Sequence, residues 1–196
     1  MAIAPNPLVA LPPGDEALWS REVAIPWQYR APHHSGRPEG RLPEPEDLVA
    51  MATRLATRAA SWPGMARPAR RRWALMAAST TAEAWVIAWP PGGAIELHDH
   101  GGSAGAVVVA AGELVETSIV SGRSGSVAQR STTIPASGSI SFDGRHVHDI
   151  VNLGPGPAVS VHVYAPRLTS MTYYRVVEGA LETGATVRYL FGEAVP

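Results

Sequence analysis

Two histidines one residue apart, His98 and His100, are the side chains of this sequence best suited to chemistry. On an extended chain alternate side chains share a face, so both imidazoles could bind one ion while Asp99 points away. A second pair downstream, His146 and His148, could supply a third imidazole from another strand. Neutral imidazole binds iron, zinc, copper or nickel, so the pattern predicts a metal site without choosing the metal.

The residues around the first pair matter, because a lone His-x-His pair is a weak signal that is also common on protein surfaces. A Pro-Pro-Gly-Gly turn at residues 90–93 precedes the pair, and Gly101 and Gly102 follow it. Together with the second histidine-bearing run, this context favours a metal site. The pair His33 and His34 lies among turn residues without a partner at ligand spacing, and we predict that it is on the surface.

The segments that must position the histidines are predicted to be short strands separated by turns that contain Gly, Ser or Pro. The predicted strands cover residues 83–89, 94–100, 105–110, 113–120, 126–134, 139–142, 147–152, 158–165, 172–178 and 186–191. One helix is predicted at residues 46–61, where apolar residues repeat at helical spacing and Glu46 and Asp47 lie in the first turn. This pattern predicts a mainly β fold, a double-sheet jelly-roll β-barrel with a short helical N-terminal part.

The chain of 196 residues is long enough for one domain with a substantial core. We expect a single domain over residues 1–196, with an N-terminal arm and helices in residues 1–68 and the barrel with its metal site in residues 69–196.

The net charge of −1 and the absence of DNA-binding patterns argue against a nucleic-acid partner. Cysteine is absent, which excludes disulfides, thiolate metal ligands and cysteine nucleophiles. The sequence has neither a long apolar run nor a signal segment, so we expect no membrane association and a cytoplasmic location. We also expect a monomer or small homo-oligomer.

Three segments between about residues 85 and 174 carry a family resemblance. The first consists of Pro-Gly-Gly at 91–93, Leu-His-Asp-His-Gly-Gly-Ser-Ala-Gly-Ala at 97–106 and Gly-Glu-Leu at 112–114. The second is His-Asp-Ile-Val-Asn at 148–152. The third is Pro-Ala-Val-Ser-Val-His-Val-Tyr-Ala-Pro at 157–166, and it continues with Leu-Thr-Ser-Met-Thr-Tyr-Tyr at 168–174. These segments resemble the cysteine dioxygenase-type thiol dioxygenases of the cupin superfamily. The part of the chain up to Pro68 matches only loosely.

The resemblance implies a cupin barrel in which His98, His100 and His148 ligate Fe(2+). The interval from His148 to Asn152 matches the family pattern, whereas His146 does not stand at the ligand position.

Many cupins use a glutamate shortly after the first histidine pair as a fourth ligand. Ala104 and Gly105 occupy those positions here, so a neutral three-histidine site is implied. Three facial imidazoles leave room for a thiolate, a second substrate donor and dioxygen. The implied reaction transfers both atoms of dioxygen to the sulfur of a small thiol, such as cysteine or 3-mercaptopropionate, and gives a sulfinate. Gly105 also stands where the animal enzymes have a cysteine bonded to a tyrosine, so that crosslink cannot form here.

Ser160, His162 and Tyr164 alternate along one predicted strand and therefore share a face. Such residues are more often packing residues when taken alone. In register with the other segments, they resemble the family's Ser-His-Tyr hydrogen-bonded relay, in which the tyrosine hydroxyl reaches the reacting oxygen or the substrate. The resemblance therefore implies a catalytic role for all three.

We predict that Arg72 binds the substrate carboxylate, with Arg71 and Arg167 as fallbacks. The family has an arginine, or in some branches a glutamine, on the strand before the first histidine pair. Counting back without gaps gives Arg72, and a different loop length gives Ala74 or Leu75. Arg71 and Arg167 are further candidates, since the planar fork of an arginine binds both oxygens of a carboxylate.

Two other functions are compatible with the ligand pattern. One is a cupin that uses a metal on a non-thiol substrate, and the other is a non-catalytic cupin that binds a small ligand. The relay favours catalysis, because a ligand-binding module does not require it.

Overall fold

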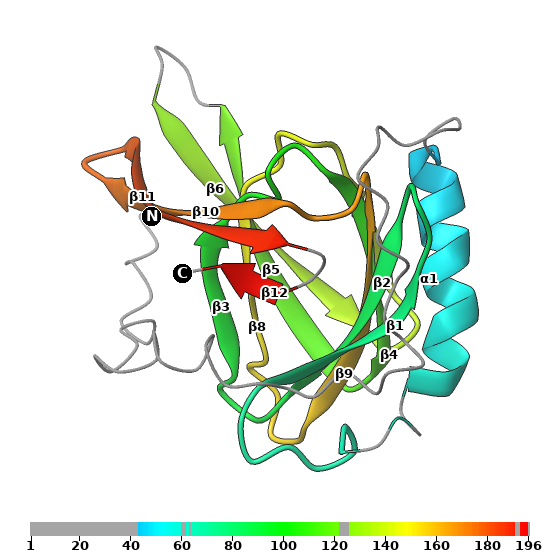
Figure 1. The fold of residues 1–196 in the computed structure, drawn as a ribbon. Coiled ribbons are helices and arrows are strands. Elements are labelled where there is room, and N and C mark those ends of the chain that lie inside the picture. Colours follow the sequence, from blue (N-terminus) through cyan, green and yellow to red (C-terminus); the bar gives the residue numbers. More distant parts are fainter. Residues whose placement is uncertain (1–42, 60–61, 63, 122–125, 191–192, 196) are drawn as a thin grey trace.

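The computed structural model describes residues 43–59, 62, 64–121, 126–190 and 193–195 (Figure 1). Most of the predicted N-terminal arm, including His33 and His34, lies outside these residues. Within the described part of the chain, no helix is long and apolar enough to cross a membrane.

The strands form two antiparallel sheets, which confirms the predicted mainly β jelly roll (Figure 1). The first sheet has the order β1 (Arg72–Ala78), β2 (Glu83–Trp89), β9 (Ala158–Ala165), β4 (Ala104–Ala111) and β7 (Ser139–Phe142). The second has the order β12 (Glu193–Val195), β11 (Ala180–Leu190), β10 (Ser170–Val177), β3 (Ala94–His98), β8 (His148–Val151), β5 (Glu113–Ser121) and β6 (Val127–Pro135).

The helix α1 (Pro45–Ala59) covers the outer face of the first sheet, and its prediction is confirmed (Figure 1). Its Leu48 and Ala52 are fully buried and belong to the same apolar cluster as Val86 of β2. The carboxylate of Asp47 accepts a hydrogen bond from the backbone N–H of Glu44 at 3.2 Å. This bond caps the start of the helix, where backbone N–H groups have no partner within the helix.

The inner core lies between the two sheets, and strand alternation separates it from the outer core under α1. On β2, outward side chains alternate with inward ones: Ala84, Val86 and Ala88 face α1, and Trp85, Ile87 and Trp89 face the barrel interior. Strand β9 is buried along its whole length, because α1 covers one face and the second sheet covers the other. Polar side chains on its inner face must therefore find partners inside the barrel.

The strand boundaries follow the turn residues closely. The strands predicted at residues 83–89 and 158–165 have the predicted ends. Strand β3 ends at His98, two residues earlier than predicted, because the chain turns at Gly101 and Gly102, whose φ angles are 58° and 91°. Neither β1 nor the short β12 is among the predicted strands.

Candidate metal centre

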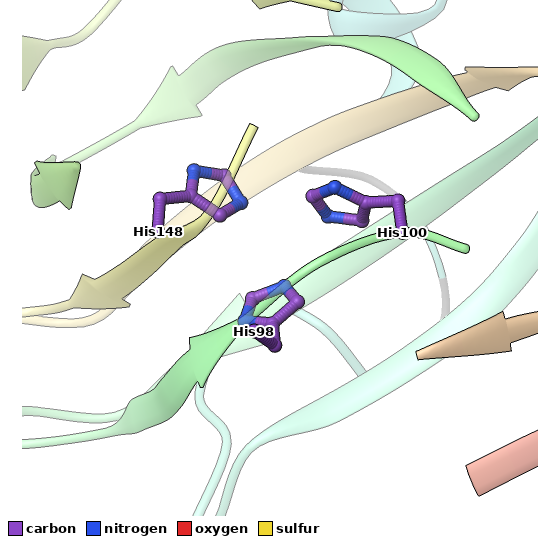
Figure 2. Close-up of side chains that lie close together, drawn as sticks. All are labelled: His98, His100 and His148. Atoms are coloured by element: carbon purple, nitrogen blue, oxygen red, sulfur yellow. The ribbon is translucent and has the colours of Figure 1, made fainter. Parts of the chain in front are cut away.

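Three buried imidazoles meet inside the barrel (Figure 2). His98 ends β3 and His148 begins β8, and the two residues are partners in the register of these strands. His100 follows in the loop after β3. The ring centroid of His98 lies 4.8 Å from that of His100, and the His148 centroid lies 5.0 Å from each. One ring nitrogen from each residue lies within 4.8 Å of the others, as the ligands of a single ion must.

In two of the three rings, a hydrogen bond determines which nitrogen is available to bind a metal ion. Nδ1 of His98 donates to the carbonyl of Glu96 at 2.7 Å, and Nδ1 of His148 donates to Oε1 of Glu116 at 2.7 Å. A neutral imidazole then keeps a lone pair on Nε2. Neither ring nitrogen of the buried His100 has a hydrogen-bond partner among the described residues. An unpaired buried polar atom is costly, and a metal ion would satisfy the unprotonated nitrogen of this ring, so the three rings fit a three-histidine metal-binding site.

Burial keeps the three rings in the neutral form that binds metal. It is the largest cause that lowers the pKa of His98 and of His100 well below the ordinary value of 6.5. Burial also lowers the pKa of His148, although the hydrogen bond to Glu116 acts in the opposite direction.

His146, the alternative third histidine, is engaged away from this centre. Its Nε2–H donates to Oε1 of Glu116 at 2.8 Å, and its ring stacks on Phe142 with centroids 5.0 Å apart. Burial favours the neutral acid at Glu116, but the N–H donors of His146 and His148 outweigh burial and lower the pKa of Glu116 to about 2. Sequence reasoning missed Glu116. The available signal was an acidic residue two positions after the buried Leu114 on one face of β5.

Asp99 points away from the imidazoles and fixes the loop that carries His100. Its carboxylate accepts hydrogen bonds from the backbone N–H of Gly101 at 2.9 Å and of Thr172 at 3.1 Å. It also accepts a bond from the hydroxyl of Tyr174 at 2.7 Å. These bonds tie the loop to β10 and hold His100 beside the other two rings.

Ser160, His162 and Tyr164 form a continuous hydrogen-bonded chain on the inner face of β9. Oγ of Ser160 lies 2.9 Å from Nε2 of His162, whose Nδ1 lies 3.2 Å from the Tyr164 hydroxyl. The indole N–H of Trp89 donates to Oγ of Ser160 at 2.8 Å, and the Tyr164 ring centroid lies 5.0 Å from that of His100. Chiefly through burial, the pKa of His162 is lowered to about 3, so its ring is neutral. These hydrogen bonds thus run from a buried indole to the hydroxyl of a tyrosine whose ring lies beside His100.

Gly105 lies directly opposite Tyr164 in the register of β4 and β9. A Cβ at Gly105 would come within 2.6 Å of the Phe142 ring, so only glycine leaves space for that ring. Phe142 in turn stacks on His100 with centroids 4.8 Å apart. The glycine therefore allows an apolar ring to pack against a metal-binding imidazole.

Arg71 lies on the inner side of the barrel. Its guanidinium donates to the carbonyl of Ala94 and lies over the rings of Trp89 and Trp73, at 5.6 Å and 5.7 Å from their centroids. After burial and a neighbouring imidazole, the charge of Arg71 is the next cause that lowers the pKa of His162. Arg71 is therefore close enough to act on the metal centre electrostatically.

The structure does not bring Arg72 or Arg167 to the metal centre. Arg72 is exposed, and its partner in the register of β1 and β2 is Ala88, which belongs to the outer core. Arg167 is held by the buried Glu83, to which its Nε donates at 3.2 Å. Arg71 and Arg72 alternate across the chain, so only one of them can face the interior, and the strand register decides which.

The metal-free protein is expected to lose stability as the pH falls below about 6.5, the ordinary pKa of histidine. Four buried histidines have a lowered pKa in the folded state: His98, His100, His148 and His162. The unfolded chain therefore binds more protons than the folded protein in this range, and each ring costs up to about 1.4 kcal/mol per pH unit. Urea unfolding with a chelator present, from about pH 8 to about pH 5.5, measures this loss. A constant free energy of unfolding across that range would contradict the buried neutral rings.

Comparisons with known proteins extend the resemblance toward the N-terminus. The family model described as Cysteine dioxygenase type I matches residues 46–176, from α1 into β10. A search of curated proteins found no match.

Several solved structures are similar to this chain at low identity. TT1209 from Thermus thermophilus is 22% identical, with 52% of this chain and 88% of that chain covered and a TM-score of 0.43. An uncharacterized conserved protein with a double-stranded beta-helix domain from Klebsiella pneumoniae subsp. pneumoniae MGH 78578 is 19% identical, with 60% and 87% covered and a TM-score of 0.40. An oxalate oxidase in complex with the substrate analogue glycolate is 18% identical, with 52% and 54% covered and a TM-score of 0.43. These likenesses carry no argument about activity.

Proposed function

Because the chain belongs to the cysteine dioxygenase type I family, we propose that it is an iron-dependent thiol dioxygenase. It adds both atoms of dioxygen to the sulfur of a small thiol, either cysteine or a related thiol carboxylic acid such as 3-mercaptopropionate, and the product is a sulfinate. The proposal is supported mainly by the hydrogen-bonded relay of Ser160, His162 and Tyr164, in which the Tyr164 ring lies beside His100 of the three-histidine centre. A site that only stores a metal or binds a ligand does not require such a chain.

One ring nitrogen from each of His98, His100 and His148 is proposed to hold Fe(2+). Bound ferrous iron supplies the dioxygen chemistry that amino-acid side chains lack. The protein provides three neutral imidazoles, and a thiolate substrate would bring the negative charge. The reaction needs no external reductant: the thiol loses its S–H proton, sulfur gives up the electrons that dioxygen takes, and both oxygen atoms remain in the sulfinate.

The relay is proposed to present a proton at the Tyr164 hydroxyl. The indole N–H of Trp89 occupies one lone pair of Ser160 Oγ, and the Ser160 hydroxyl can donate to Nε2 of the neutral His162. Nδ1–H of His162 can then donate to the Tyr164 oxygen. We propose that in this order the Tyr164 hydroxyl, at the end of the relay, donates to the substrate or the reacting oxygen.

Arg71 is proposed to bind the substrate carboxylate. A carboxylate that enters a largely apolar pocket needs a charged partner, because an unpaired buried charge is costly. The guanidinium of Arg71 lies over Trp73 and Trp89, and this cation–π contact restricts its position before substrate arrives. A preorganised planar fork can bind both carboxylate oxygens.

Arg71→Ala is expected to weaken the binding of carboxylate-bearing thiols by about 2–5 kcal/mol, roughly 30-fold to several thousand-fold in Kd. Cysteamine, which lacks the carboxylate, should be turned over almost as before and so reports on folding. Arg72→Ala is the matched control, since it removes the same charge from the adjacent exposed residue. Steady-state kinetics with both kinds of thiol measure the difference. A loss of carboxylate binding in Arg72→Ala, with Arg71→Ala unaffected, would reverse the assignment.

Oxygen uptake by the iron-loaded protein tests the proposed function as a whole. Cysteine, 3-mercaptopropionate and cysteamine should be compared with their counterparts that lack the thiol. We expect thiol-dependent uptake with at least one thiol acid and accumulation of its sulfinate. Uptake with none of the thiols by a protein that holds its metal would overturn the proposal.

A further inference from the structure

A buried carboxylate stands directly behind one of the metal-binding rings. Glu116 of β5 is 5% exposed, and a single oxygen, Oε1, accepts the Nδ1–H of His148 at 2.7 Å and the Nε2–H of His146 at 2.8 Å. A charge inside a barrel is tolerated only when it is paired and hydrogen-bonded. These two imidazoles provide the hydrogen bonds.

The side of His148 that Glu116 contacts determines what the carboxylate can do. Glu116 holds Nδ1, so it is not a further ligand of an ion bound at Nε2. A charge-assisted hydrogen bond at Nδ1 fixes the orientation of the ring and its tautomer, and it increases the electron density that the other nitrogen donates. Glu116 can therefore strengthen the metal centre without touching the metal.

The contact with His146 gives the carboxylate a second fixed point. The His146 side chain is 22% exposed, and its ring stacks on Phe142 at a centroid distance of 5.0 Å. Since both N–H groups converge on the same oxygen, His146 restrains the rotation of the Glu116 carboxylate toward solvent. His146 thereby links the rim of the barrel to the buried ligand.

We propose that Glu116 is a positioning residue for the metal centre, which orients His148 and raises its donor strength, and that His146 acts through Glu116. The inference rests on the three-histidine centre and not on the thiol reaction. It can therefore hold or fail independently of the proposed function.

Metal affinity of the full-length apo-protein, measured for Fe(2+) and Zn(2+) by competition with a chelator, tests the role of Glu116. Glu116→Gln is expected to weaken binding by about 10- to 100-fold, the usual effect of losing a partner behind a metal-binding histidine. Asp149→Asn is the matched control. Its carboxylate lies on the neighbouring residue of β8, accepts the N–H of Thr117 at 3.2 Å, and alternates away from the inward-facing His148. An affinity in Glu116→Gln within about twofold of that in Asp149→Asn would overturn the proposal.

The reduction potential of the bound iron separates positioning from a merely structural role. Removing the negative charge that is hydrogen-bonded to the His148 ring should raise the potential, because the ferric state loses more stabilisation than the ferrous state. Asp149→Asn should leave the potential near that of the unmodified protein. A potential that is unchanged in Glu116→Gln would mean that Glu116 only supports the fold.

A double-mutant cycle tests whether His146 acts through Glu116. His146→Ala should weaken metal binding by a few-fold in the native background, with about one ion still bound per chain when metal is in excess. In the Glu116→Gln background the same change should have no further effect. Full additivity of the two substitutions would show that His146 acts by another route.

Discussion

Replacing His100 with Ala is expected to leave the protein with almost no bound metal and no measurable turnover. Both of its ring nitrogens are buried without a hydrogen-bond partner in the described residues, and a bound ion would satisfy the unprotonated one. Two imidazoles remain in the variant, too few to hold an ion in a site of this kind. Elemental analysis after purification, with thermal unfolding as a check of the fold, measures the loss. The same result is expected for His98→Ala and His148→Ala.

His146→Ala is the matched control for these three variants. Its ring is as close in sequence to His148 as His98 is to His100, but its Nε2 is bound to Glu116. The variant should retain close to one ion per chain when metal is in excess. Full metal occupancy in His148→Ala, or an empty site in His146→Ala, would contradict the assignment of the ligands.

Tyr164→Phe is expected to keep its metal and to slow sulfinate formation by about 10²- to 10⁴-fold. The substitution removes one hydroxyl and little volume, so the 5.0 Å packing of the ring against His100 is retained. The lost group is the end of the hydrogen-bonded chain that begins at Trp89. Single-turnover measurement of product, rather than oxygen uptake alone, isolates the affected step.

Combined substitutions test whether the relay residues act as a unit. Residues that act as a unit have non-additive effects on rate, so Tyr164→Phe should add little to a His162→Gln variant that is already slow. A rate in Tyr164→Phe equal to that of the unmodified protein would reduce Ser160, His162 and Tyr164 to packing residues.

Local pattern was sufficient for the parts of the site that lie close together in sequence. His98 and His100 are separated by one residue, and a period of two brings both to one side even though β3 already ends at His98. Ser160, His162 and Tyr164 lie on one strand whose ends are marked by turn residues, so their shared face was predictable. Choosing the third ligand required the family resemblance. His146 and His148 are two residues apart, so strand alternation places both on the same face and does not distinguish them.

The parts that could not be predicted depend on register between distant strands. Whether Arg71 or Arg72 faces the interior follows from the pairing of Arg72 with Ala88, which local sequence does not encode. Glu116 meets His146 and His148 across separations of 30 and 32 residues, and its buried position follows only from the pairing of β5 with β8. An acidic residue among apolar neighbours is ambiguous until its partners are known.

Labelled dioxygen tests the proposed function most directly. The iron-loaded protein is incubated with a thiol acid under ¹⁸O₂ in unlabelled water, and the product is analysed by mass spectrometry. We expect a sulfinate in which both oxygen atoms on sulfur carry the label, with one dioxygen consumed for each thiol. A product with one labelled oxygen, or a disulfide with no oxygen on sulfur, would contradict the proposed function.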